Sequence, residues 1–154
     1  MASSDDFIAQ EISIITQIAS MIVEAAKGLS SWSKNISSAF SISAASETAN
    51  GVSITISNSA PEAMAFERGS GIHGPEGETY AIDPINGPTL NFHGTHGYGN
   101  PWVTPTHVDH PGVAARPFLH PANLQVMPIG LEMLKVALRG AVYLSIREGW
   151  LSHN

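Results

Sequence analysis

The sequence predicts an α+β fold, because helical periodicity at both ends of the chain encloses a middle segment with the alternation of a β-hairpin. Apolar residues recur every three or four positions near both termini, which is typical of amphipathic helices. In the middle, apolar and polar residues alternate, which is typical of half-buried strands. With 154 residues the chain has the length of one domain, so we predict a single domain over residues 1–154.

The N-terminal helix is predicted over residues 5–27. Its apolar face has positions spaced by three or four residues: Ile8, Ile12, Ile15, Ala19, Ile22 and Ala26. Asp5 and Asp6 suit its start, and Lys27 followed by Gly28 suits its end. A second apolar stripe widens the face: Ile14, Ile18, Met21 and Ala25. We therefore expect this helix to pack on more than one neighbour.

Two short helices are also predicted. Helical spacing within residues 29–39 is diluted by serines, and its apolar positions are Leu29, Trp32 and Ile36. The second short helix is expected over residues 60–68, because Pro61 suits a first turn and good helix formers follow it. Gly69 should end it.

A β-hairpin is predicted between these two helices. Residues 40–44 and 52–57 alternate between apolar and hydroxyl side chains. The segment 47–51 has the composition of a turn between two strands. The hairpin should be antiparallel, with one face in water.

A long loop insertion is predicted over residues 69–112, where Gly, Pro and His dominate. Regular structure is expected only in short pieces such as 89–92 and 102–104. The aromatic residues of the loop favour ordered packing over disorder: Tyr80, Phe92, Tyr98 and Trp102. Because loops of this length are usually functional, we predict a partner-binding arm in which Phe92, Tyr98 and Trp102 contribute contacts.

The stretch 110–122 connects this arm to a long C-terminal helix. Three prolines and a glycine make it a rigid, extended crossing that delivers Phe118 and Leu119 to the start of the helix. The helix is predicted from the spacing of Leu124, Met127, Leu131, Leu134, Leu138 and Val142. Pro128 should start or kink it.

Composition restricts the class of protein. The charged fraction of 13% is about half that of a typical soluble domain, so we expect neighbouring subunits to cover part of the surface. A net charge of -6 with only 7 Lys and Arg argues against a surface that binds nucleic-acid phosphates. The absence of cysteine excludes disulfides and thiolate zinc sites. We expect neither a signal peptide nor the roughly 20 apolar residues that span a bilayer, and hence a soluble, intracellular protein.

Histidines provide the main catalytic alternative, a metal-dependent enzyme. Six of the seven lie between His73 and His120, with close pairs at residues 93–96 and 107–110. Asp109 could act as a further ligand or as a hydrogen-bond acceptor. Neither pair lies on a predicted helix, where a fixed spacing would place both rings on one face. Loop histidines more often bond to backbone groups or stack on aromatic rings, so we expect no metal and no cofactor.

Other catalytic sites have less support. The segment 69–71, Gly-Ser-Gly, lacks the strand–turn–helix context of a hydrolase serine, and no Gly-rich phosphate loop is present. Glu67 could pair with Glu76 or Glu78, but nothing fixes their separation, on which carboxylate chemistry depends. We therefore predict a protein that is not an enzyme.

Glu67 and Arg116 are two charges within apolar or small-residue segments. One hypothesis is that they pair, within or between subunits, because a charge at an apolar surface needs a partner. The alternative is that both face water, where exposed pairs contribute little. Either way, they are candidate interaction residues together with Phe118 and Leu119.

Two short motifs resemble a known family. They are Ala-Phe-Glu-Arg-Gly-Ser at residues 65–70 and Arg-Pro-Phe-Leu-His-Pro-Ala at 116–122. Together with the order of segments, they resemble the small neck or tail-completion proteins of long-tailed bacteriophages. That family has an aromatic residue where Arg68 stands and often Arg where His120 stands, and its usual linker is shorter than the loop here.

The resemblance implies a non-enzymatic virion protein at the head-to-tail junction. It implies a ring, most often a hexamer, between the head connector and the tail tube or tail-terminator protein, assembled in the host cytoplasm without a membrane. DNA would pass through an acidic lumen without specific binding. Lateral contacts would come from the helices and sheet edges, and axial contacts from the His-rich arm.

Overall fold

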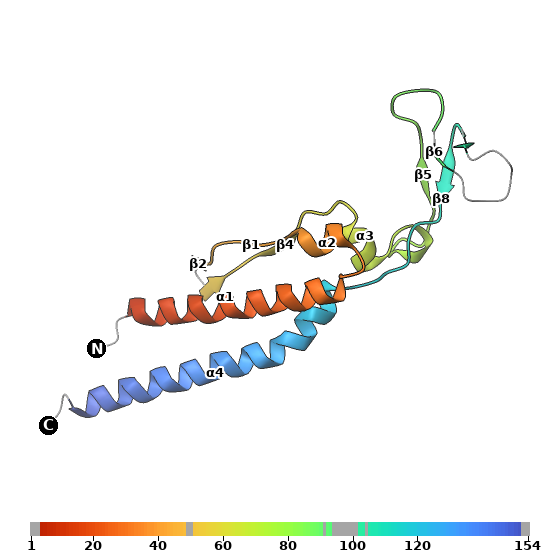
Figure 1. Ribbon diagram of the computed structural model, residues 1–154. Helices are drawn as coiled ribbons and strands as arrows, with labels where there is room; N and C mark the ends of the chain where they lie inside the picture. The colour runs from red at the N-terminus through yellow and green to blue at the C-terminus, as the bar shows by residue number, and fades with distance from the viewer. Residues whose placement is uncertain (1–3, 49–50, 91, 94–101, 104, 152–154) are drawn as a thin grey trace. The chain divides into compact units, whose positions relative to one another are not determined.

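The computed structural model describes residues 4–48, 51–90, 92–93, 102–103 and 105–151 (Figure 1). The chain divides into two compact units: Met1–Ala63 with Pro117–Asn154, and Met64–Arg116. The first unit holds both long helices and the Ser-rich hairpin, and the second holds the arm. The predicted α+β class is confirmed, with a long helix near each terminus and small antiparallel sheets between them.

Helix α1 (Ser4–Leu29) confirms the predicted N-terminal helix. Its buried side chains lie in the second half of the helix. Four of them come from the two predicted stripes and the fifth, Val23, lies beside them: Ile18, Ala19, Ile22, Val23 and Ala26. Figure 1 shows α4 on one side of α1 and the Ser-rich strands alongside it. The expectation of more than one neighbour is therefore confirmed within the first unit.

One property of α1 differs from the expectation. Over Asp6–Leu29 it is long and apolar enough to cross a membrane by length and composition, which corrects the statement that no stretch reaches this length. The isoleucines of the two stripes together raise the mean hydropathy of the helix, although the spacing of either stripe by itself is that of an amphipathic helix. A core helix of a soluble protein passes the same test.

The hairpin is present as two nested pairs of antiparallel strands that follow helix α2 (Lys34–Ser38). Outer pair β1 (Phe40–Ile42) and β4 (Ile56–Asn58) aligns Ser41 with Ser57, whose hydroxyl oxygens lie 2.8 Å apart. Inner pair β2 (Ser46–Thr48) and β3 (Gly51–Ser53) aligns Thr48 with Gly51. Both residues belong to strands and not to the predicted five-residue turn, because the pairing continues further toward the tip.

Helix α4 (Leu119–Leu151) confirms the predicted C-terminal helix and contains Pro128 within it. Pro128 therefore does not start the helix, and Figure 1 shows a bend in its first half, as a missing backbone donor explains. The side chain of Phe118, directly before α4, is 2% exposed and meets the Phe40 ring edge-on at 5.8 Å. The crossing thus delivers its aromatic anchor to the core of the first unit.

The second unit begins in helix α3 (Ala63–Arg68), which starts later than predicted because residues 61–62 form a turn. A single 3-10 turn, η1 (Gly71–His73), follows. The predicted loop then forms nested strand pairs: β5 (Tyr80–Ile82) with β8 (Val108–His110), and β6 (Phe92–His93) with β7 (Trp102–Val103). The arm is therefore a two-stranded ribbon, of which the sequence indicated the inner pair.

Candidate functional site

The segment around the first motif and the segment directly before the second come together in the second unit as a backbone ladder. The N–H of Arg116 donates to the carbonyl oxygen of Phe66 over 2.6 Å. Ser70 forms two bonds with Val113: its N–H donates to the Val113 carbonyl over 2.9 Å, and its Oγ accepts from the Val113 N–H over 3.1 Å. The N–H of Ile72 donates to the Pro111 carbonyl over 2.9 Å. Segments about 40 to 50 residues apart in the chain are thus tied side by side.

Two glycines make this ladder possible. Gly71 and Gly112 have φ angles of 61° and 87°, in the left-handed region that favours glycine. A Cβ atom on Gly71 would overlap the carbonyl oxygen of Pro111, and one on Gly112 would overlap that of Ser70. The two backbones therefore approach each other more closely than any residue with a side chain would allow.

The predicted interaction residues of the motif segments differ in exposure. Glu67 lies on α3 and is half-buried, whereas Arg116 is exposed, and their ion pair stays a prediction. Phe118 is buried in the core, so it can affect an interaction surface only indirectly, by anchoring the start of α4. Leu119, the first residue of α4, is half-buried.

The aromatic residues of the arm are only partly described. In the β6–β7 pair, Phe92 lies opposite Val103 and Trp102 opposite His93. Tyr98 lies outside the described residues. Phe92 and Trp102 thus occupy adjacent steps of one strand pair, as the predicted short pieces suggested.

A histidine between two carboxylates lies at the β5–β8 pair. Nδ1 of His107 is 2.8 Å from Asp83 Oδ1, and Nε2 is 3.1 Å from Asp109 Oδ1. Hydrogen bonds to Asp83 first, and then to Asp109, raise the pKa of His107 above its usual value. Two roles were predicted for Asp109, metal ligand or hydrogen-bond acceptor, and the structure shows it as a hydrogen-bond partner of His107. Asp83 was not predicted, because only the strand pairing brings it within reach.

In this arrangement a carboxylate lies beside each nitrogen of His107. His110 Nδ1 accepts the N–H of Gly112 over 2.9 Å, and its ring packs against Tyr80 at 5.1 Å. These are the backbone and aromatic partners expected for loop histidines. Within the described part of the chain, no three His, Asp or Glu side chains are grouped to hold a metal. His96 lies outside that part, so the absence of a metal stays a prediction.

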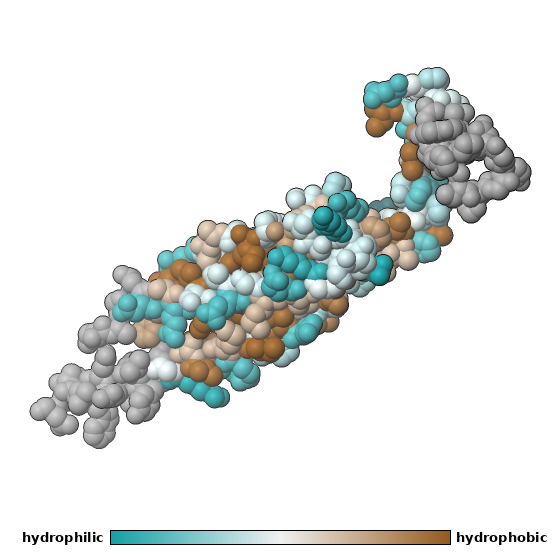
Figure 2. All heavy atoms as spheres, viewed as in Figure 1, coloured by the Kyte–Doolittle hydropathy of each residue, from teal (hydrophilic) through white to brown (hydrophobic). Residues whose placement is uncertain are grey.

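Helix α4 carries several large apolar side chains that are open to solvent. The positions of α4 that are fully buried are small or medium in size: Ala122, Val126 and Gly130. The large apolar residues, whose spacing predicted the helix, lie mostly open to solvent. We call one group the leucine flank: Leu124 (60% exposed), Met127 (38%), Leu131 (48%) and Leu138 (66%). Figure 2 shows apolar side chains open along the helical part of the molecule.

A second open apolar line runs along the opposite side of α4. It contains Ile129 and Val136, which are 51% and 66% exposed and seven residues apart, and we call it the valine flank. Because successive helix residues are about 100° apart, Ile129 and Leu131 project to either side of Gly130, which faces Ile18 of α1. Helix α1 therefore covers only the middle of a broad apolar arc.

Comparison with protein-family models, with curated proteins and with solved structures finds no match for this chain. The function is therefore inferred from the motifs, the backbone ladder and the open surfaces described above.

Proposed function

We propose that this chain is a structural assembly protein of the neck of a long-tailed bacteriophage. By resemblance to that family it forms a six-fold ring that joins the head connector to the tail tube or tail terminator. The protein carries out no chemical reaction in this role. Its place is the virion, after assembly in the host cytoplasm.

The observation that carries this proposal is the backbone ladder. The segments 65–72 and 110–116 contain or adjoin the two motifs that resemble the neck family, and they bond to each other through Phe66, Ser70 and Ile72. One bond of the ladder, from the Arg116 N–H to the Phe66 carbonyl, joins the two motifs directly, and this supports reading them together rather than as two separate short matches. The ladder closes the base of the ribbon, which serves as the arm that contacts an adjacent ring.

The open flanks of α4 support the same role. A helix with apolar residues over most of its circumference is normally buried. In a monomer, the leucine and valine flanks would leave large side chains in water, whereas ring subunits bury such surfaces laterally.

Binding to neck components tests the proposal. Purified chain should bind head-connector or tail-tube rings produced from the genes beside its own, and electron micrographs should show an added ring layer. The Gly112→Ala variant, which disrupts the ladder, should lose this binding, while Gly87→Ala, where a Cβ meets nothing within 4 Å, should keep it. Neighbouring genes that encode no portal, capsid or tail-tube protein would contradict the proposal.

Metal analysis tests the enzymatic alternative. Stoichiometric zinc or iron in the purified chain, lost together with an activity in His96→Ala or His107→Ala, would replace the neck assignment with a metal-dependent enzyme. The structural role predicts that both variants retain ring binding.

A further inference from the structure

An Asn-Gly pair lies on the arm, in the loop that joins β5 to β6. The sequence has such pairs at residues 50–51 and 86–87, and the second lies entirely within the described residues. Figure 1 shows this loop beyond the end of β5, away from the strand pairs of the ribbon. Asn86 and Gly87 are both exposed, and Ile85 directly before them is 94% exposed. The pair is therefore open to water.

An asparagine followed by glycine can lose its side-chain amide without an enzyme. The backbone nitrogen of the glycine attacks Cγ of the asparagine, and the new N–Cγ bond closes a succinimide ring. The Cγ–Nδ2 bond breaks, and ammonia leaves with the proton of the backbone amide. Water then opens the ring at either carbonyl, which gives aspartate or isoaspartate with no oxidant or reductant. Glycine favours the attack, because it has no Cβ in the way and its backbone rotates freely.

Both reacting groups of this pair are available. Among the residues that the structure describes, no hydrogen bond engages the side chain of Asn86 or the N–H of Gly87. A Cβ atom built on Gly87 would meet nothing within 4 Å, so the space around the attacking nitrogen is open. The side-chain amide can therefore turn toward this nitrogen without breaking any contact of the fold.

The pair Asn58-Ser59 shows how the fold blocks the same reaction elsewhere. Nδ2 of Asn58 donates to the Ile36 carbonyl over 2.8 Å, and Oδ1 accepts the Ala60 N–H over 3.0 Å. The N–H of Ser59 donates to the Ala39 carbonyl over 3.1 Å. The amide and the nitrogen that would attack it are thus both held in place, so the reaction requires these bonds to break first.

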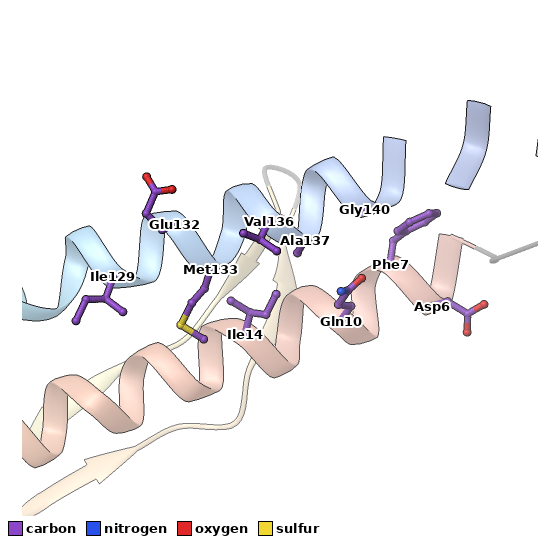
Figure 3. A pocket seen from close by; sticks show the side chains of 10 residues that line it. All are labelled: Asp6, Phe7, Gln10, Ile14, Ile129, Glu132, Met133, Val136, Ala137 and Gly140. Carbon is purple, nitrogen blue, oxygen red and sulfur yellow. The ribbon is translucent and has the colours of Figure 1, made fainter. Parts of the chain in front are cut away.

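Exposure of an amide is not sufficient by itself. Figure 3 shows the exposed side chain of Gln10 in an open hollow between α1 and α4, near Ile14. The backbone nitrogen of the next residue, Glu11, lies within α1, where helical hydrogen bonding engages it. Glutamine would also have to close a larger ring, which forms more slowly. The loop of the arm instead combines an exposed asparagine, an unbonded neighbouring nitrogen and an unhindered glycine.

We propose that Asn86-Gly87 is a site of spontaneous deamidation on the arm. The product has a carboxylate in place of a neutral amide, which adds one negative charge to a chain with a net charge of -6. Isoaspartate also routes the backbone through the side-chain carbons and so lengthens the loop between β5 and β6. The arm then exists in two chemical forms, in proportions set by the age of the chain. This inference does not rest on the proposed function.

Incubation of the purified full-length chain tests the proposal. The attacking nitrogen reacts in its deprotonated form, so the reaction should be faster at mildly alkaline than at neutral pH. Ion-exchange chromatography should show a growing form with one additional negative charge. Peptide mapping with electron-transfer fragmentation should assign the change to Asn86, as aspartate and isoaspartate, while Asn58 stays intact. An Asn86 that keeps its amide for as long as Asn58 does would overturn the proposal.

Gly87→Ala is the matched variant, because it retains Asn86 and changes only the residue that attacks it. Gly87 has open space for a Cβ and is not among the glycines with a positive φ angle, so circular dichroism of the variant should match the wild type. Deamidation of Asn86 should be several times slower in this variant, since the methyl group hinders the attack. Equal rates in the two proteins would contradict the assigned chemistry.

Unfolding in guanidinium chloride separates the effect of the fold from that of the sequence. Asn58 loses its hydrogen bonds there and should deamidate faster than in the folded chain. Asn86 should react at a similar rate in both states, because the fold does not hold it. An Asn86 that is much slower in the folded chain would show that the loop protects it and would overturn the inference. Binding to neck rings is measured separately, so its failure contradicts the neck role alone.

Discussion

Ile18 of α1 packs directly onto Gly130 of α4, so that a Cβ atom at this glycine would lie 2.9 Å from Ile18 Cδ1. Glycine within a helix costs about 1 kcal/mol relative to alanine, so its presence here needs a reason. Close approach of the two long helices supplies it, because Ile18 is itself buried and has little space to move.

Gly130→Val should therefore destabilise the first unit by about 1–3 kcal/mol through overpacking of the α1–α4 contact. Urea unfolding followed by circular dichroism measures this change. Gly140→Ala is the matched control on the same helix, since a Cβ there meets nothing within 4 Å, and it should stabilise the chain by up to about 1 kcal/mol. Equal effects of the two substitutions would show that α1 and α4 do not meet at Gly130.

Phe118→Ala should cost about 3–5 kcal/mol of unfolding free energy, because the ring is 2% exposed and packs edge-on against Phe40. Ile85→Ala removes a side chain that is 94% exposed and should change stability by less than about 0.5 kcal/mol. The comparison is made by denaturant unfolding of both variants. A Phe118→Ala protein as stable as Ile85→Ala would remove this residue from the core.

Periodicity was sufficient to predict the long helices and the Ser-rich hairpin, because each has a regular apolar pattern over many residues. It did not identify the inner face of α4. Large leucines dominate the pattern, but a close helix contact selects small residues, and so Ala122, Val126 and Gly130 face inward while Leu124 and Leu131 stay open.

The arm shows a different limit. Its strands are only two or three residues long and lie among glycines and prolines, so local alternation is too short to indicate β5 or β8. Their pairing brings Asp83 to His107, 24 residues away, a contact that neither residue's neighbours predict. The ladder likewise depends on positive φ angles at Gly71 and Gly112, which composition alone does not distinguish from other glycines of the loop.

Gly112→Ala should open the ladder and expose the N–H groups of Ser70 and Ile72 to hydrogen exchange. The substitution combines a backbone strain of about 1–2 kcal/mol with overlap on the Ser70 carbonyl, so its effect should exceed strain alone. Gly77→Ala isolates the strain, because Gly77 has a φ of 71° but open space around it. Hydrogen-exchange mass spectrometry should rank Gly112→Ala as the larger effect; the reverse order would contradict the close approach.

His107 should make the base of the ribbon more stable at low pH than at high pH. Protonated His107 donates to both Asp83 and Asp109, whereas the neutral ring has one N–H and can donate to only one of them. Because the folded pKa is raised above 6.5, this stabilisation is fully present below pH 6.5 and is lost as the pH rises through the folded value.

The NMR titration of the His107 ring should show the raised pKa directly, and Asp83→Asn should lower this pKa by removing the larger of the two causes. In hydrogen exchange corrected for intrinsic rates, protection of the β5 and β8 amides should fall between about pH 5.5 and about pH 8.5 in the wild type, and His107→Gln should remove this difference. Protection that rises with pH, or a titration unchanged by Asp83→Asn, would show that the two carboxylates do not hold the ring.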